Sequence, residues 1–284
     1  MMKAILLPTD FSNNSVNAIH YAMRLFKDER CEFYILNIQK ASSFISDDML
    51  VMSSTATLYN TLVEAAKKSI NNLIVNLKKQ FKNDNHIFHA LVDYDNFVDS
   101  VNQITTQHKI DLIVMGTHGA SGLKKMLFGS NTVHVIKRSK VPVLVIPDKC
   151  RFKNLDEVGF TTSFKSKYEE QDFKFLRDLL VRHKSHLFVM HVIQSEDTEI
   201  ELNDNVDFFK LNFDDVSIQR IPNHKDSVYN GIHEFADAHK LKLIVMLAKT
   251  HGFLNRLFSE YRVETFAFKI DLPLLVLKQV KSDS

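Results

Sequence analysis

The chain repeats itself at long range, and this repeat constrains the fold more than any other feature of the sequence. The segment KIDLIVM at 109–115 recurs as KLKLIVM at 240–246, and VPVLV at 141–145 recurs as LPLLV at 272–276. Both pairs are offset by 131 residues, so the stretch between them aligns without a gap. The sequence therefore predicts two tandem copies of one domain.

The second copy is shorter than the first in its middle. Residues 5–11 correspond to 158–164 at an offset of 153, so the offset falls by 22 residues between the two ends of the repeat. The loss falls where the first copy carries a long amphipathic segment, 57–81, typical of a helix. The corresponding stretch of the second copy, 194–215, is short, acidic and weakly periodic.

The length of 284 residues also suits two domains, each large enough to bury its own core. We expect one domain over residues 1–147 and a second over 155–284, joined by a short polar linker. Within the first copy, apolar runs alternate with segments of helical periodicity. The expected strands are 4–7, 33–38, 87–92, 112–115 and 141–146, and the expected helices are 13–26, 57–81, 97–108 and 131–137. This alternation predicts an α/β fold with a parallel sheet covered on both faces.

Composition excludes several classes of protein. The net charge is +2 with both signs intermixed, which gives no field to attract nucleic acid. The two cysteines form no CxxC pair, as expected for a reducing cytoplasm. The first apolar run stops at Pro8, too early for a signal peptide, and no stretch reaches the roughly 18 apolar residues of a membrane span. We expect a cytoplasmic protein that binds neither nucleic acid nor membrane.

Glycine is scarce, yet four of the seven glycines fall within fourteen residues, at Gly116, Gly119, Gly122 and Gly129. This loop follows an expected strand and opens an expected helix at Ser130. Glycines let main-chain N–H groups approach phosphate oxygens, and the start of a helix favours an anion. The loop is therefore a candidate phosphate cradle, although glycine loops also serve as plain turns.

A carboxylate stands close to this loop if the sheet is doubly wound. Ligands of such sheets bind at the carboxyl ends of the strands where the strand order reverses, which would bring Asp10 beside Gly116. Asp10 could accept hydrogen bonds from ribose hydroxyls or hold a Mg²⁺ ion that bridges to phosphate. It could equally cap the helix that begins near Asn13. The simplest interpretation of the other polar residues of the loop, His118, Lys124 and Lys125, is that they lie at the protein surface.

Three segments together resemble the ATP-binding branch of the universal stress protein family. They are Pro8-Thr9-Asp10, the run Gly-x2-Gly-x9-Gly-Ser from Gly116 to Ser130, and Val141-Pro142-Val143. The resemblance implies two tandem Rossmann-like domains, each with a five-stranded sheet of order 3-2-1-4-5. It implies that ATP is bound by Pro8, Thr9, Asp10, Ile38 at the adenine, Met115, Gly116, Gly119, Gly129, Ser130 and Asn131. Family members pair as dimers through their last strands, and the tandem chain resembles such a dimer with both domains in one polypeptide. A homodimer of whole chains is a further expectation.

The second copy departs from this pattern at the residues that would meet phosphate. In the second copy, Leu247, Thr250 and Glu260 replace Gly116, Gly119 and Gly129. Tyr261 replaces Ser130, and Ser163 replaces Asp10. A carboxylate about 4–5 Å from a phosphate charge repels it by roughly 3–4 kcal/mol at an effective dielectric near 20. We therefore expect one ATP per chain, in the first copy, and an architectural or partner-binding role for the second.

Two other functions stay open. A slow ATP-hydrolysing enzyme is one, but the sequence contains no Walker A run, HExxH, Gly-x-Ser-x-Gly or Cys/His cluster with metal spacing. We accordingly assign no catalytic residue and no protein-held metal site. The other is an interaction protein with no physiological nucleotide.

Overall fold

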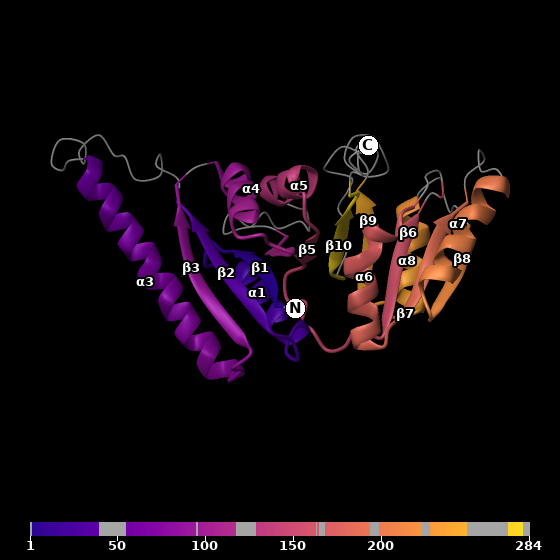
Figure 1. The fold of residues 1–284 in the computed structure, drawn as a ribbon, viewed down its shortest axis with the longest axis horizontal. Helices are drawn as coiled ribbons and strands as arrows, with labels where there is room; N and C mark the ends of the chain where they lie inside the picture. The colour runs from indigo at the N-terminus through magenta and orange to yellow at the C-terminus, as the bar shows by residue number, and fades with distance from the viewer. Residues whose placement is uncertain are drawn as a thin grey trace. The chain divides into compact units, whose positions relative to one another are not determined.

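The computed structural model describes residues 2–39, 55–94, 96–117, 129–162, 164, 168–193, 199–222, 228–248 and 272–280. The chain divides into two compact units, and the boundary along the chain falls after Phe152. Each unit is an α/β domain with a parallel sheet, so the expected fold class is confirmed (Figure 1). The expected bounds of the domains, 1–147 and 155–284, stay a prediction.

The first unit alternates strands and helices from its beginning to its end. Its elements are β1 (Lys3–Pro8), α1 (Asn13–Leu25), β2 (Cys31–Ile38), α3 (Thr55–Phe81), β3 (His86–Asp93), α4 (Phe97–Gln107), β4 (Leu112–Gly116), α5 (Ser130–Arg138) and β5 (Val143–Ile146). The strands are parallel in the order β3-β2-β1-β4-β5. The order 3-2-1-4-5 is therefore confirmed.

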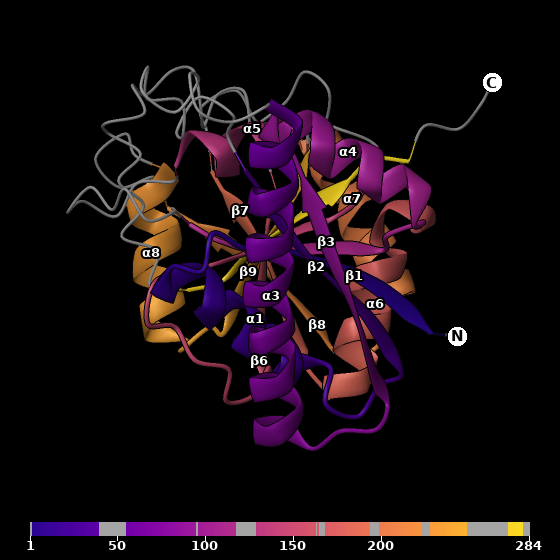
Figure 2. The same cartoon turned by 90° about the vertical axis from the view of Figure 1, so that its left-hand side faces the viewer.

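Helices cover both faces of this sheet. The chain moves outward from β1 to β3 and then returns to β4 and β5, and right-handed crossovers place the helices of the two legs on opposite faces. The edge contact between the rings of His20 in α1 and Phe81 in α3 agrees with this layering. The helix α3 runs alongside β3 (Figure 2). Buried between the layers, Ile5, Leu6 and Leu7 of β1 are fully inaccessible, as a continuous apolar strand requires.

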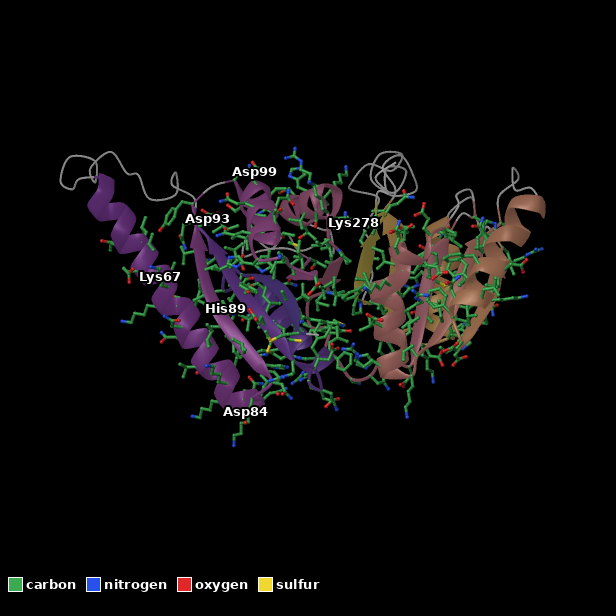
Figure 3. All side chains as sticks on the ribbon, viewed as in Figure 1. Lys67, Asp84, His89, Asp93, Asp99 and Lys278 are labelled. Atoms are coloured by element: carbon green, nitrogen blue, oxygen red, sulfur yellow. The ribbon has the colours of Figure 1, made fainter. Side chains whose placement is uncertain are left out.

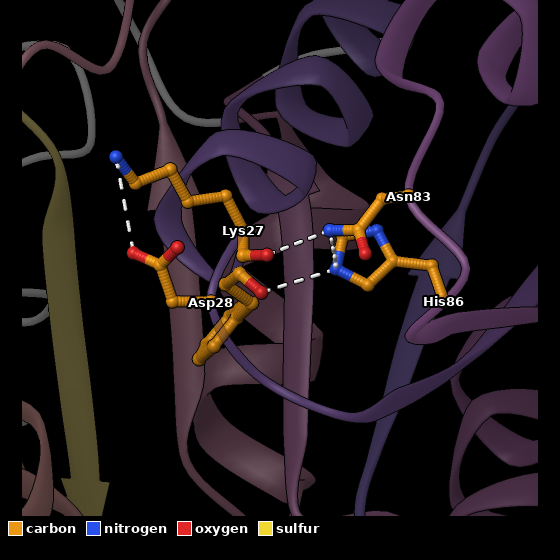
Figure 4. Close-up of polar contacts among 5 residues, drawn as sticks. Lys27, Asp28, Asn83 and His86 are labelled. Carbon is orange, nitrogen blue, oxygen red and sulfur yellow. Dashed lines mark hydrogen bonds and ion pairs between the residues drawn. The ribbon is translucent and has the colours of Figure 1, made fainter.

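A buried histidine fixes the turn that leads into β3. His86 is 6% exposed, and its Nε2 lies 3.1 Å from the main-chain oxygen of Phe26. The Nδ2 of Asn83 lies 3.1 Å from the same Nε2 and donates to the main-chain oxygen of Lys27 at 2.6 Å (Figure 4). Burial lowers the pKa of His86, and the hydrogen bond to Phe26 opposes this shift. The imidazole thereby ties the start of β3 to the end of α1.

The second unit repeats the same topology. Its elements are β6 (Glu157–Thr162), α6 (Glu170–His183), β7 (His186–Val192), α7 (Glu199–Asn212), β8 (Val216–Ile221), α8 (Val228–Ala238), β9 (Leu243–Ala248) and β10 (Leu274–Lys278). The strands are parallel in the order β10-β9-β6-β7-β8, which is the order of the first unit read from the other end.

The shortening of the second copy falls in the helix that follows its second strand. The helix α7 has 14 residues where α3 has 27. Although its sequence is weakly periodic, α7 forms because Phe208 and Phe209 pack against Phe173 of α6, at ring distances of 5.6 and 5.5 Å. Tertiary packing here outweighs a poor local pattern. Among the helices of the described ranges, not one combines the length and the apolar character that crossing a membrane requires.

Candidate functional site

The carboxyl ends of β1 and β4 lie side by side in the first unit. Leu6 pairs with Ile113 in the parallel register, which places Pro8 level with Met115. The chain leaves β1 toward β2 and leaves β4 toward β5, so the strand order reverses between these two strands. This reversal point is where doubly wound sheets bind their ligands.

Hydrogen bonds fix the turn that follows β1. Thr9 is buried, and its Oγ1 accepts a hydrogen bond from the N–H of Phe11 at 3.0 Å and lies 2.9 Å from the hydroxyl of Ser15. Phe11 has a left-handed backbone with φ of 62°, which the turn imposes. The main-chain oxygen of Thr9 accepts a hydrogen bond from Asn37 Nδ2 at 2.7 Å. A rigid turn of this kind presents the next residue, Asp10, in a defined position.

The carboxylate of Asp10 lies at the surface beside the start of α1. Its Oδ1 accepts a hydrogen bond from the N–H of Ser12 at 3.0 Å. The N-cap of α1 is Ser12, whose hydroxyl accepts from the N–H of Ser15. Asp10 therefore supports the turn before the helix and does not cap it.

The end of β4 is packed against Asn14, a residue that the sequence analysis did not single out. A β-carbon on Gly116 would overlap Asn14 Oδ1 and would lie 2.8 Å from Asn14 Cγ. Asn14 is 5% exposed, its Nδ2 lies 3.4 Å from Thr117 Oγ1, and its Oδ1 has no hydrogen-bond partner among the described residues. In this structure the missing side chain of Gly116 makes room for a buried carboxamide.

The start of α5 is held against the end of β4. The N–H of Gly129 donates to the main-chain oxygen of Thr117 at 2.7 Å. The hydroxyl of Thr132 lies 3.2 Å from the oxygen of Gly116 and 3.1 Å from that of Thr117. Gly129 is the N-cap and supplies no side-chain cap, so the N–H groups of the first turn remain suited to an anion.

The structure brings most of the expected site residues together at one end of the sheet. Those gathered there are Pro8, Thr9, Asp10, Met115, Gly116, Gly129, Ser130 and Asn131. Ile38 ends β2 at the same end of the sheet, two residues beyond the pairing of Pro8 with Leu36, and is half-buried. Gly119, His118, Lys124 and Lys125 lie outside the described residues. Sequence reasoning missed Asn14, Asn37 and Thr132, whose only signal was a polar side chain within an apolar pattern.

The second unit keeps the turn after its first strand. Thr162 Oγ1 accepts a hydrogen bond from the N–H of Phe164 at 2.9 Å, and Phe164 has a φ of 54°. The hydroxyl of Tyr168 contacts that of Thr162, as Ser15 contacts Thr9 in the first unit. The Nδ1 of His191 lies 3.2 Å from the main-chain oxygen of Thr162, where Asn37 contacts Thr9. The two copies therefore share this network in detail.

In the second unit, aromatic side chains pack over the turn that follows the first strand, so that this turn is buried. Phe164 is 2% exposed, whereas the equivalent Phe11 is 36% exposed. Its ring stacks on His191 at 5.0 Å, and Asn205 of α7 donates to its main-chain oxygen at 2.7 Å. Leu247, the counterpart of Gly116, is buried. Ser163, Thr250, Glu260 and Tyr261 lie outside the described residues.

The fold, with polar residues gathered at the reversal point, defines the class of Rossmann-like α/β domains. The universal stress protein family model matches residues 1–147, more than half of the 284 residues. The chain therefore belongs to the universal stress protein family.

Known proteins of this family resemble the chain in sequence and in fold. A universal stress protein of Methanocaldococcus jannaschii is 32% identical over 162 residues, which is 52% of this chain and 97% of that protein. The crystal structure of a universal stress protein from Archaeoglobus fulgidus covers 98% of both chains, with a TM-score of 0.72 and 19% identity. This second likeness shows that the fold is shared over both units. A universal stress protein solved in complex with cAMP is 20% identical, with a TM-score of 0.37, over 52% of this chain.

Proposed function

We propose that the first unit binds ATP, or a close adenine nucleotide, at the carboxyl ends of β1 and β4. The observation that carries this proposal is the start of α5, which lacks a side-chain cap and is held over the end of β4 by Gly129 and Thr132. A helix start of this kind binds phosphate through its free N–H groups and its dipole. The family to which the chain belongs supports the same conclusion.

The residues present fit the parts of a nucleotide. The N–H groups of Ser130 and Asn131 and the Ser130 hydroxyl would hold phosphate, because both residues are exposed in the first turn of α5. Asp10, exposed after β1 at the same end of the sheet, would accept hydrogen bonds from ribose or hold a Mg²⁺ ion together with phosphate oxygens. Ile38 would pack against adenine. Gly119 would complete the phosphate loop and stays a prediction from the sequence.

We propose a regulatory role in the stress response that depends on binding, with hydrolysis absent or slow. Catalysis of phosphoryl transfer needs a residue that positions the attacking water, together with cations that stabilise the transferred charge. Around the end of β1 the described side chains are the neutral Thr9, Asn14 and Ser15, and Asp10 is the one carboxylate among residues 8–17. Within the described ranges, no three His, Cys, Asp or Glu side chains gather as metal ligands.

We propose that the second unit binds no ATP and acts in architecture or partner recognition. Phe164 and its aromatic neighbours fill the place that corresponds to the exposed turn of the first unit. Leu247, which is buried, stands at the position equivalent to Gly116, against which the first unit packs Asn14. We also expect the protein to act in the cytoplasm, because its two cysteines, Cys31 and Cys150, are both free.

Calorimetric titration of the full chain with Mg-ATP tests the proposal, with cAMP as a comparison ligand. We expect a stoichiometry near one, and loss of binding in Gly129→Glu. Chromatography of nucleotide released on denaturation identifies any ligand that co-purifies. A stoichiometry near two would refute the asymmetry between the units. Absence of binding by any adenine nucleotide would favour an interaction protein, and steady turnover that Asp10→Asn abolishes would favour an ATPase.

A further inference from the structure

A second polar cluster lies in the second unit, at the opposite end of the strands from the turn of Thr162. His186 is the first residue of β7, while Asp215 directly precedes β8 and Ser217 is its second residue. Leu187 pairs with Val216 and Phe188 with Ser217 in the parallel register. The register therefore brings the three polar side chains together across two neighbouring strands.

The three side chains form a continuous chain of hydrogen bonds. His186 Nδ1 lies 2.6 Å from Asp215 Oδ1, and His186 Nε2 lies 2.8 Å from Ser217 Oγ. An ionised carboxylate can only accept, so the Nδ1 of a neutral His186 carries the proton. The Nε2 lone pair then accepts the hydrogen bond of the Ser217 hydroxyl. This is the order of orienting acid, base and nucleophile that activates a serine.

Packing holds the imidazole in this orientation. The rings of His186 and Phe188 meet edge to face at 4.5 Å. Phe188 is itself packed against Phe235 of α8 at 5.5 Å and against His239 at 5.1 Å. The side chain of His186 is 25% exposed, so the base is restrained and still reachable from solvent.

A side-chain amide lies near the serine, and the main-chain N–H of the next residue lies on the outer side of β8. Gln219 Nε2 lies 3.5 Å from Ser217 Oγ, on the same face of β8. The N–H of Leu187 donates to the oxygen of Asp215 at 2.9 Å, and in a parallel ladder the N–H of Ile218 then points away from β7. The residue after the nucleophile and a glutamine amide are both known kinds of oxyanion donor.

The first unit carries a different set of side chains at the equivalent positions. Tyr34 pairs with His89 as Phe188 pairs with Ser217, so His89 of β3 takes the place of the serine (Figure 3). There Glu32 Oε2 lies 3.0 Å from His89 Nε2 and accepts a hydrogen bond from Tyr34 at 2.7 Å. The first unit therefore supplies a matched control that has an imidazole and a carboxylate but no serine.

We propose that Ser217 is an activated nucleophile for acyl transfer from small carboxylic esters. Its Oγ attacks the ester carbonyl while its proton passes to His186 Nε2. The alcohol leaves with that proton, and an acyl group remains on Ser217. Water, deprotonated by His186, then attacks the acyl carbonyl and releases the carboxylic acid, and the proton returns to Ser217. Asp215 is a positioning residue that holds the reactive tautomer, and the activity is independent of nucleotide binding in the first unit.

The test treats the full chain with a fluorophosphonate probe and with p-nitrophenyl acetate, and locates the adducts by peptide mass spectrometry. Modification of Ser217 is expected, faster than that of any other serine. His186→Gln and Ser217→Ala should abolish the adduct, whereas His89→Gln in the first unit should leave it unchanged. Asp215→Asn should slow modification about tenfold or more, since the amide favours the wrong tautomer, and Asp215→Glu should restore part of the rate.

Circular dichroism and the Mg-ATP stoichiometry should be unchanged in all of these variants, which separates this result from the nucleotide proposal. A wild-type chain whose Ser217 stays unmodified would overturn the proposal. Equal modification of Ser217 in wild type and in a folded His186→Gln variant would also overturn it, because the hydrogen bonds would then be structural only.

Discussion

The carboxamide of Asn14 occupies the space that a β-carbon on Gly116 would need. The two residues come from the start of α1 and the end of β4, so this contact fixes the helix to the strand at the candidate site. The Nδ2 of Asn14 also lies 3.4 Å from Oγ1 of Thr117, and the main-chain oxygen of Thr117 accepts a hydrogen bond from the N–H of Gly129. The geometry of the proposed phosphate site thus depends on a residue that need not touch the nucleotide.

Gly116→Ala should destabilise the first unit because the new methyl group cannot share space with Asn14. Overpacking of this kind costs about 1–3 kcal/mol. Asn14→Ala alone should cost stability through lost packing, but the double variant should recover part of the loss. The measurement is amide hydrogen exchange of β1 and β4 in the full chain, arranged as a double-mutant cycle. Strictly additive effects would show that the two side chains do not compete.

Gly129→Glu should abolish ATP binding while the fold persists. Gly129 has an extended backbone with φ of −61°, which any residue can adopt, so little strain is expected. A carboxylate about 4–5 Å from phosphate costs roughly 3–4 kcal/mol at an effective dielectric near 20, or about a hundredfold to a thousandfold in affinity. Gly129→Gln, of the same size without the charge, should bind ATP more tightly than Gly129→Glu. Unchanged affinity in both folded variants would place the phosphates elsewhere.

The stability of the first unit should fall as the solution becomes acidic. Burial lowers the folded-state pKa of His86 below its ordinary value, and burial together with Arg24 and Arg151 lowers that of His20. The unfolded state therefore binds protons first as the pH falls below about 6.5, which favours unfolding. The stabilisation is complete above that value and is lost as the pH falls toward the folded pKa values.

Hydrogen exchange of the β3 amides, compared at about pH 7.5 and about pH 5.5, measures this loss. His86→Gln should flatten the pH dependence, and the part that remains should disappear on substitution of His20. A wild-type pH dependence that His86→Gln leaves intact would exclude His86 as its source.

The last strand of each unit should pair with the other, side by side and antiparallel. We base this prediction on the sequence, because an edge strand leaves a row of unpaired N–H and C=O groups that proteins cover or pair. The segments 141–146 and 274–277 are apolar, and each has a proline near its start, where a missing N–H costs least. Residues 1–147 expressed alone should therefore self-associate or aggregate, as sedimentation will show. A well-behaved monomer, with rapid exchange of the β5 amides in the intact chain, would contradict the pairing.

The sequence by itself determined the repeat, the order of the elements and the position of the proposed site along the chain. Buried parallel strands and amphipathic helices leave their period in short windows, so β1 to β5 were predicted to within a few residues. The differences occur at the ends. The helix α1 stops at Leu25 where the pattern ran to Phe26, and β5 starts at Val143 because the N–H of Val141 donates to Ser139 Oγ in a turn.

The tertiary structure alone decided which distant side chains meet. Asn14 reaches Thr117 across 103 residues, and His186 reaches Ser217 across 31. Strand register and helix packing set these contacts, and no local period records them. Packing between distant segments also explains why the turn at Phe164 is buried in the second unit. Its aromatic residues were visible in the sequence, but only the packing of α7 over the turn of Phe164 showed that they bury this residue, whereas the equivalent Phe11 is exposed.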